Sequence, residues 1–278
     1  GVGARNQAET VPSLIESIIF EKLGVKAEVY NLAVRGYQSF QELVRYRQFL
    51  LQNSADIVIS VSGFNDAYIS LINPDIRYSL LPKSVYERGV DIVQRAEKGE
   101  PIILNINGYF RSISHFLDLL YRVSIRATRL VGRVDLLGQK VPNNPDYSLI
   151  PARVKISAMH YRMMKNLAEL NGAKFIYMTQ PTAYDWRDFK FDLPDLPPEK
   201  HRIHKKFTNN YYYALLSSLH DVDARDIGNV MDRKSDMPFI DRGHINGAAA
   251  KFVANRIFDE IRGDILKRIG HNSPVSHQ

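Results

Sequence analysis

The sequence predicts an α/β fold in which helices cover a parallel sheet. Segments with apolar residues at helical spacing alternate along the chain with short apolar runs of strand length. The connections between those runs are long enough to hold the helices that parallel strands require. The chain has 278 residues, of which 45% are hydrophobic and 24% charged, values typical of a globular protein with one sizeable core.

The first helix and the first visible strand are predicted between residues 10 and 34. Thr10 is suited to cap a helix and Gly24 to end it. Between them, the apolar residues that recur on one helix face are Val11, Leu14, Ile15, Ile18, Ile19 and Leu23. Residues 27–34 are strand-like and end in the turn Arg35-Gly36-Tyr37-Gln38.

A second helix and a buried strand follow. The run Ser39-Phe40-Gln41-Glu42 is a capping-box pattern and predicts a helix to about Gln52. Residues 55–63 predict a buried strand that ends in the polar turn Gly63-Phe64-Asn65-Asp66, in which we expect Asp66 to fix the turn. Ligands bind at such strand ends in open α/β sheets, so this turn is the first candidate site.

The second half of the chain continues the alternation. Helices are expected at 152–170, 206–219 and 246–269, and strands at 173–181 and 222–227. The stretch 182–198 is predicted to be a loop over the strand ends, either part of a substrate pocket or an ordinary surface loop. We therefore expect a single domain over 1–269 and a frayed tail over 270–278.

Residues 69–144 are predicted to form a helical insertion, with helices near 84–97 and 113–131. One face of the second helix carries the basic stripe Arg122, Arg126, Arg129 and Arg133. Such a stripe is either a solvated helix face or a binding patch for an acidic glycan, lipid or carrier protein.

Composition limits the chemistry that the chain can perform. The formal charge of +7 favours acidic partners, but no nucleic-acid reader motif accompanies it, so specific nucleic-acid binding is not expected. The absence of cysteine excludes disulfides, thiolate metal sites and a cysteine nucleophile. No cofactor is expected, because no phosphate-cradling glycine loop occurs. His201 and His204 could ligate a metal, but a solvated helix entrance within the basic run 200–206 explains them better.

A second candidate site precedes the last predicted helix. Asp241 lies three residues before His244 on an expected loop. A carboxylate so placed can bind one ring nitrogen of the histidine and leave the other facing a nucleophile, as a general base requires.

Three stretches of the chain resemble the second, third and fifth sequence blocks of the SGNH, or GDSL-like, hydrolases. They are Asn31-Leu32-Ala33-Val34-Arg35-Gly36, Gly63-Phe64-Asn65-Asp66 and Asp241-Arg242-Gly243-His244, in the family's order. The resemblance implies a flavodoxin-like three-layer fold and acyl-ester chemistry through a Ser-His-Asp triad. It also implies that the Gly36 N–H and the Asn65 side chain are oxyanion donors, that His244 is the general base, and that Asp241 orients it.

The family's first block, which ends the central first strand and supplies the serine nucleophile, does not occur in this sequence. Gly1-Val2-Gly3-Ala4 is similar to the residues just after that block, so we expect the serine upstream of Gly1. A natural loss of the nucleophile is the alternative. A segment upstream of Gly1 could also carry a secretion signal or a membrane anchor, which favours an extracytoplasmic or membrane-anchored location.

The resulting hypothesis is a serine esterase that acts on a small acyl ester, such as an O-acetyl group on a glycan. Two alternatives are kept: an acyltransferase with the same site, and a catalytically inactive SGNH-like binding domain. The natural ester, the acyl acceptor and the oligomeric state are not predicted.

Overall fold

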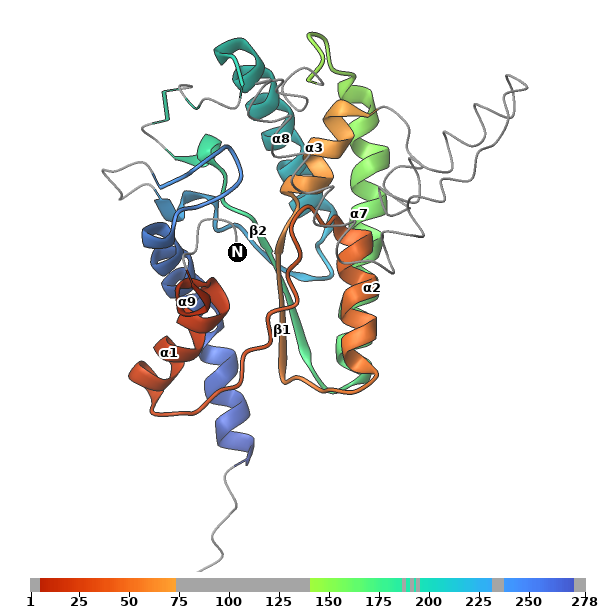
Figure 1. Cartoon of the computed structure of the whole chain (residues 1–278). Coiled ribbons are helices and arrows are strands. Elements are labelled where there is room, and N and C mark those ends of the chain that lie inside the picture. Colours follow the sequence, from red (N-terminus) through yellow and green to blue (C-terminus); the bar gives the residue numbers. More distant parts are fainter. Residues whose placement is uncertain are drawn as a thin grey trace, which may run out of the picture. The chain divides into compact units, whose positions relative to one another are not determined.

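The computed structural model describes residues 6–73, 141–186, 189–190, 193, 196–231 and 238–272. These ranges form a mixed α/β fold with one parallel sheet of strand order β1-β2-β3 (Figure 1), which confirms the predicted fold class at this level. The strands are β1 (Ile57–Ser62), β2 (Lys174–Thr179) and β3 (Asp223–Arg225). All three lie within runs that the sequence predicts to be strands.

Six α-helices lie in the described ranges. They are α1 (Val11–Leu23), α2 (Ser39–Leu50), α3 (Phe64–Ile72), α7 (Ile150–Leu170), α8 (Pro198–Ser218) and α9 (Gly247–Asn272). Short 3-10 turns are η1 (Gln7–Glu9), η4 (Tyr147–Leu149), η5 (Ala183–Asp185) and η6 (Gly228–Met231). Helix α1 has the predicted bounds and ends at Gly24 in a left-handed conformation, whereas α8 begins ahead of the predicted residue 206.

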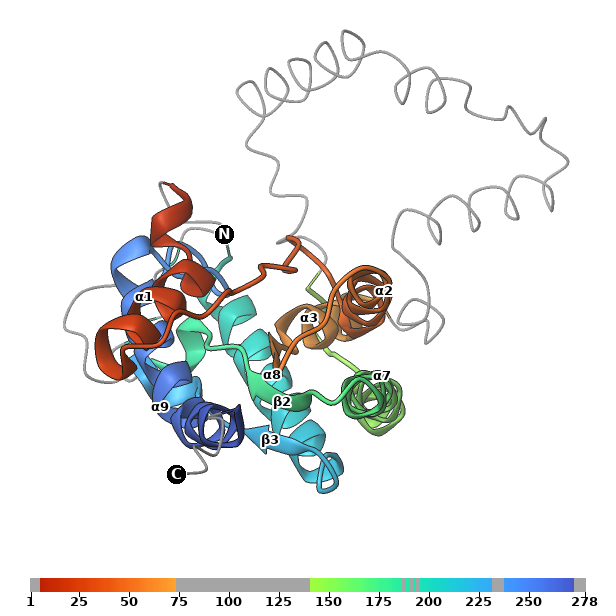
Figure 2. The same ribbon diagram turned by 90° about the horizontal axis from the view of Figure 1, so that it is seen from below.

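Helices cover both faces of the sheet (Figure 2). Helices α1 and α9 pack together on one face, where Ile176 and Met178 of β2 join the apolar core. Helices α2 and α7 pack together on the other face, where the ring centroids of Tyr161 and Tyr177 are 4.5 Å apart. In β2 the alternation of side chains therefore supplies two apolar faces, as a sheet between two helix layers requires.

The prediction of a strand at 27–34 is wrong. These residues run as extended chain and form no sheet pairing within the described ranges. The Val29 N–H is 3.4 Å from a Glu16 carboxylate oxygen, and the Ala33 N–H bonds the Asn31 side chain. A strand needs a hydrogen-bonded neighbour, and here the sequence pattern is present without one.

The polar turn after β1 is also shorter than predicted. Helix α3 begins at Phe64 and continues to Ile72, so the predicted start of the insertion at residue 69 falls inside a helix. The predicted helices at 84–97 and 113–131, with the arginine stripe, lie outside the described residues. At the other end, α9 continues to Asn272, and residues 273–278 of the predicted frayed tail are not described.

Gly63 allows the tight turn between β1 and α3. Its φ is 108°, a region that favours glycine. A Cβ atom at this position would lie 2.7 Å from the Tyr177 hydroxyl oxygen and 2.8 Å from Cε1 of Tyr212. The Tyr177 hydroxyl donates to the Ser62 carbonyl at 3.0 Å, so the turn is held closely against β2 and α8.

Candidate active site

The loop that carries His244 is held in shape by its own hydrogen bonds. Phe239 and Ile245 form an antiparallel bridge at its base. Within the loop, Oδ1 of Asp241 accepts the backbone N–H groups of Gly243 and His244, each at 2.9 Å. These two bonds fix the Asp241 carboxylate at the Nδ1 edge of the histidine ring.

The predicted pair of His244 and Asp241 is formed. Nδ1 of His244 lies 2.7 Å from Oδ2 of Asp241 and 2.9 Å from Oδ1. Burial raises the pKa of Asp241, but the hydrogen bonds from the His244 ring and the Gly243 N–H outweigh it, so the pKa is lowered. Because the carboxylate binds Nδ1, Nε2 is the ring nitrogen left for proton transfer, and no residue in the described ranges bonds to it.

Gln180, just beyond β2, links this loop to the end of β1. Its backbone N–H donates to the Ser62 carbonyl at 3.0 Å, and its side-chain amide donates to the Gly243 carbonyl at 2.8 Å. A Cβ atom on Gly243 would lie 2.5 Å from the Phe64 ring, so only glycine permits this approach. The histidine loop and the β1–α3 turn are therefore fixed side by side.

The two predicted oxyanion donors are also neighbours. Nδ2 of Asn65 donates to the Tyr37 carbonyl at 2.8 Å, which ties the β1–α3 turn to the turn that contains Gly36. This bond uses one N–H of the amide, and no described residue accepts the other. Gly36 is exposed, with a φ of 80°, and its N–H likewise donates to none of the described groups. Both groups are thus available as hydrogen-bond donors.

A cavity of about 1190 Å³ joins these residues. Its lining includes Gly36, Asn65 and His244 near the carboxyl end of β1, together with Ser62. Asp241 does not line the cavity and lies behind the histidine. Three of the four predicted site residues therefore share one cavity, and the fourth acts on it through His244.

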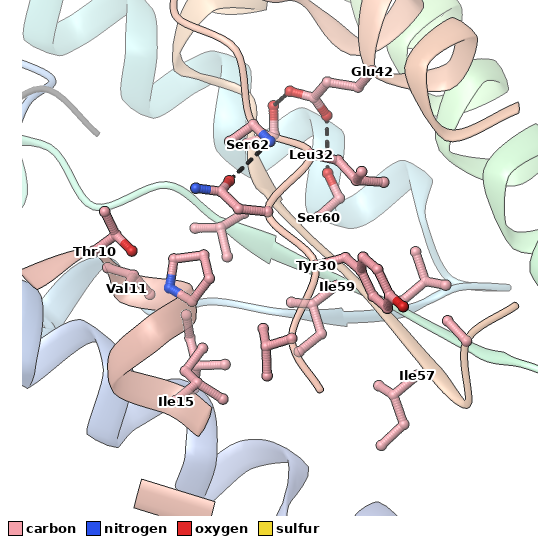
Figure 3. Close-up of a pocket in the computed structure, with 18 of the residues that line it drawn as sticks. Thr10, Val11, Ile15, Tyr30, Leu32, Glu42, Ile57, Ile59, Ser60 and Ser62 are labelled. Carbon is pink, nitrogen blue, oxygen red and sulfur yellow. Dashed lines mark hydrogen bonds between the residues drawn. The ribbon is translucent and has the colours of Figure 1, made fainter. Parts of the chain in front are cut away.

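The same cavity extends along the edge of β1 that pairs with no other described strand (Figure 3). The extended chain at 25–37 lines the cavity as well, and apolar side chains of α1, α2 and α9 contribute to its walls: Ile15, Ile19, Tyr46, Phe49, Val253, Ile257 and Ile261. Strand β1 is only half buried over Ile57–Val61, whereas β2 is buried from Phe175 to Thr179. An apolar strand that pairs on one edge alone leaves a row of backbone groups available to another strand.

Glu42 is a residue of this cavity that the sequence analysis does not single out. Its carboxylate accepts the Ser62 hydroxyl at 2.5 Å and the Ser60 hydroxyl at 3.0 Å (Figure 3). Burial raises the pKa of Glu42 to about 7, the serine hydroxyls oppose the rise, and the nearby Asp66 carboxylate adds to it. The available signal was Ser60 and Ser62 on one face of a buried strand, since buried hydroxyls require partners.

No serine of the described ranges is hydrogen-bonded to His244. The Ser62 hydroxyl bonds Glu42, and the Ser39 hydroxyl is buried against Asp66 at 2.7 Å. Both serines therefore have structural partners other than His244.

The interpretation of His201 and His204 as a solvated helix entrance is wrong. Both side chains are fully buried, and ring Nδ1 atoms lie 3.2 Å and 2.7 Å from the Tyr184 hydroxyl. They occupy the inward face of α8, while Arg202 and Lys206 of the same helix are exposed. No group of three or more histidine, aspartate or glutamate side chains is placed to hold a metal ion in the part of the chain that the structure describes.

None of the helices in the described ranges combines the length and the apolar character that a bilayer crossing needs. The chain matches no protein-family model, no curated protein and no solved structure at a significant level.

Proposed function

We propose that this chain carries the general base and the oxyanion donors of a serine esterase of the SGNH type. The observation that supports this most is the His244–Asp241 pair. His244 keeps one ring nitrogen for proton transfer and lines the same cavity as Gly36 and Asn65. A base oriented by a carboxylate and two uncharged donors are what acyl-ester hydrolysis requires besides a nucleophile.

Each residue has one role in the proposed reaction. A serine hydroxyl attacks the ester carbonyl carbon while Nε2 of His244 takes its proton, and Asp241 stabilises the resulting imidazolium. The Gly36 N–H and the Asn65 amide donate to the carbonyl oxygen as it gains negative charge. The C–O bond to the alcohol then breaks, the alcohol leaves with the proton from His244, and water hydrolyses the acyl-serine by the same steps.

The serine is proposed to come from residues that precede Gly1. The cavity beside β1 supports this source, because it borders an edge of β1 that has no partner strand among the described residues. That strand has six residues and is roughly 20 Å long at about 3.3 Å per residue. Thr10 and Val11 at the start of α1 line the cavity with Ser62 and His244. A strand that leads into α1 would therefore run parallel to β1 and end beside His244.

Such a strand would also account for the extended chain at 27–34. Its second edge would face those residues, which have strand-like sequence but no partner within the described ranges. The sheet would then have four parallel strands between two helix layers, as part of the flavodoxin-like arrangement that the resemblance to SGNH hydrolases implies.

An acyltransferase would use the same groups and differ only in passing the acyl group to a sugar hydroxyl instead of water. An inactive binding domain would keep the site without a serine. An O-acetyl group on a glycan remains the proposed substrate. Its support is the arginine stripe in the sequence, which lies outside the described residues. Detection of an acylated sugar by mass spectrometry would identify transfer.

Turnover of p-nitrophenyl acetate by the full-length protein tests the proposal. His244→Ala should reduce kcat at least a thousandfold, because it removes the base. His220→Ala is the matched control, since His220 is exposed on the turn before β3. Equal rates for the wild type and His244→Ala would remove His244 from the mechanism, and an inactive wild type would favour the binding domain.

A further inference from the structure

A buried polar cluster lies behind the two proposed oxyanion donors. Asp66 follows Asn65 directly and is 3% exposed, and Ser39 begins α2 three residues after Gly36. The Asp66 carboxylate accepts the Ser39 N–H at 3.0 Å and the Ser39 hydroxyl at 2.7 Å. The two residues thus connect the first turn of α3 to the first turn of α2.

Two further residues complete the cluster from α7. The Ser157 hydroxyl donates to Asp66 at 2.9 Å and lies 2.7 Å from the Tyr211 hydroxyl of α8. Nδ1 of His160 lies 2.9 Å from the Ser39 hydroxyl oxygen. Because that hydroxyl gives its only proton to Asp66, His160 must donate through Nδ1, and burial lowers its pKa to about 4, which keeps it neutral.

The carboxylate is well suited to this position. It accepts hydrogen bonds from the first residue of α2 while lying in the first turn of α3, so the positive ends of two helix dipoles meet at one anion. Burial raises the pKa of Asp66, and the three hydrogen-bond donors that it receives from Ser39 and Ser157 oppose the rise because they favour the accepting carboxylate. The sequence suggests only that Asp66 fixes its own turn. In the structure it also binds the start of α2.

We propose that Asp66 is a positioning residue that holds the Gly36 and Asn65 donors at the spacing an oxyanion needs. The inference rests on the proposed function. Two contacts join the donor-bearing turns: the Asp66 carboxylate with the N–H and hydroxyl of Ser39, and the Asn65 amide with the Tyr37 carbonyl. Loss of the first leaves the second alone to hold both turns, and a displacement of about 1 Å at a reacting centre lowers rates by about a hundredfold.

Asp66→Asn in the full-length protein tests this role, because the substitution keeps the shape and replaces one acceptor oxygen with a donor. We expect kcat for p-nitrophenyl acetate to fall by about ten- to a hundredfold with KM changed less than about threefold. We also expect faster hydrogen exchange at the Ser39 amide. Ile18→Ala is the control for lost stability, because Ile18 is buried in the core between α1 and α9 and does not line the cavity.

The outcomes separate the two proposals. An active wild type whose kcat falls in Asp66→Asn but not in Ile18→Ala supports the positioning role. An active wild type with an unchanged kcat in Asp66→Asn overturns that role and leaves the esterase intact. An equal loss of kcat in both variants also overturns it, by reducing the effect to stability. A wild type without turnover overturns the proposed function and this inference together.

Discussion

Replacing Glu42 with Gln should change how stability depends on pH. The folded carboxyl has a pKa of about 7 against an ordinary 4.5, so between these values the unfolded chain releases a proton that the folded protein keeps. Between these two pKa values, the contribution of this group to the free energy of unfolding therefore falls by about 1.4 kcal/mol for each unit by which the pH rises. The loss is complete above pH 7. The pKa difference of about 2.5 corresponds to a total loss of about 3 kcal/mol.

Glutamine removes this titration and can still satisfy both serines. Its carbonyl oxygen can accept the Ser62 hydroxyl, while its amide nitrogen can donate to the Ser60 oxygen. Glu42→Gln should thus match the wild type near pH 4 and exceed its unfolding free energy by up to about 3 kcal/mol at pH 8. Urea denaturation at a series of pH values measures the difference.

Glu169→Gln is the matched control, since Glu169 is exposed on α7. Its difference from the wild type should not vary with pH in the same way. If the free energy of unfolding of Glu42→Gln differed from that of the wild type by a constant amount from pH 4 to pH 8, the Glu42 carboxyl would not titrate near neutrality. Its proposed pKa shift would then be wrong.

The oxyanion and backbone assignments predict two further results. Asn65→Ala should lower kcat by about 10²- to 10³-fold because one donor is lost, whereas a change confined to KM would assign Asn65 to substrate binding. Gly63→Ala should lower the free energy of unfolding by roughly 2–5 kcal/mol, because φ is 108° and the new Cβ would overlap Tyr177 and Tyr212. Gly263→Ala on α9, where a Cβ meets nothing within 4 Å, should instead leave stability equal or up to about 1 kcal/mol higher in urea denaturation.

Much of the fold could be predicted from local patterns. The apolar spacing of α1 and the left-handed Gly24 that ends it are properties of a short stretch of chain. The strand at 27–34 could not be judged this way, because pairing depends on a neighbour that is remote in sequence. The same holds for His201 and His204, whose neighbours in sequence are basic but whose positions on α8 face Tyr184.

The contacts of the site could be predicted between residues that are close in the sequence, but not between residues that are far apart in it. Asp241 and His244 are three residues apart, so their spacing alone indicates their contact. Gln180 is 63 residues away from Gly243 in the sequence, and no short sequence pattern reveals the hydrogen bond between them. The bond from Asp66 to Ser39 has the same character, because it depends on how two helix starts meet in space.

Covalent labelling of the active serine tests whether His244 activates a serine that precedes Gly1. A fluorophosphonate forms an Oγ–P bond with a base-activated serine and releases fluoride, and mass spectrometry of the digested full-length protein locates the modified residue. We expect one modified serine preceding Gly1, with labelling lost in His244→Ala and kept in His220→Ala. Labelling of a serine within residues 1–278, or labelling that does not depend on His244, would contradict it.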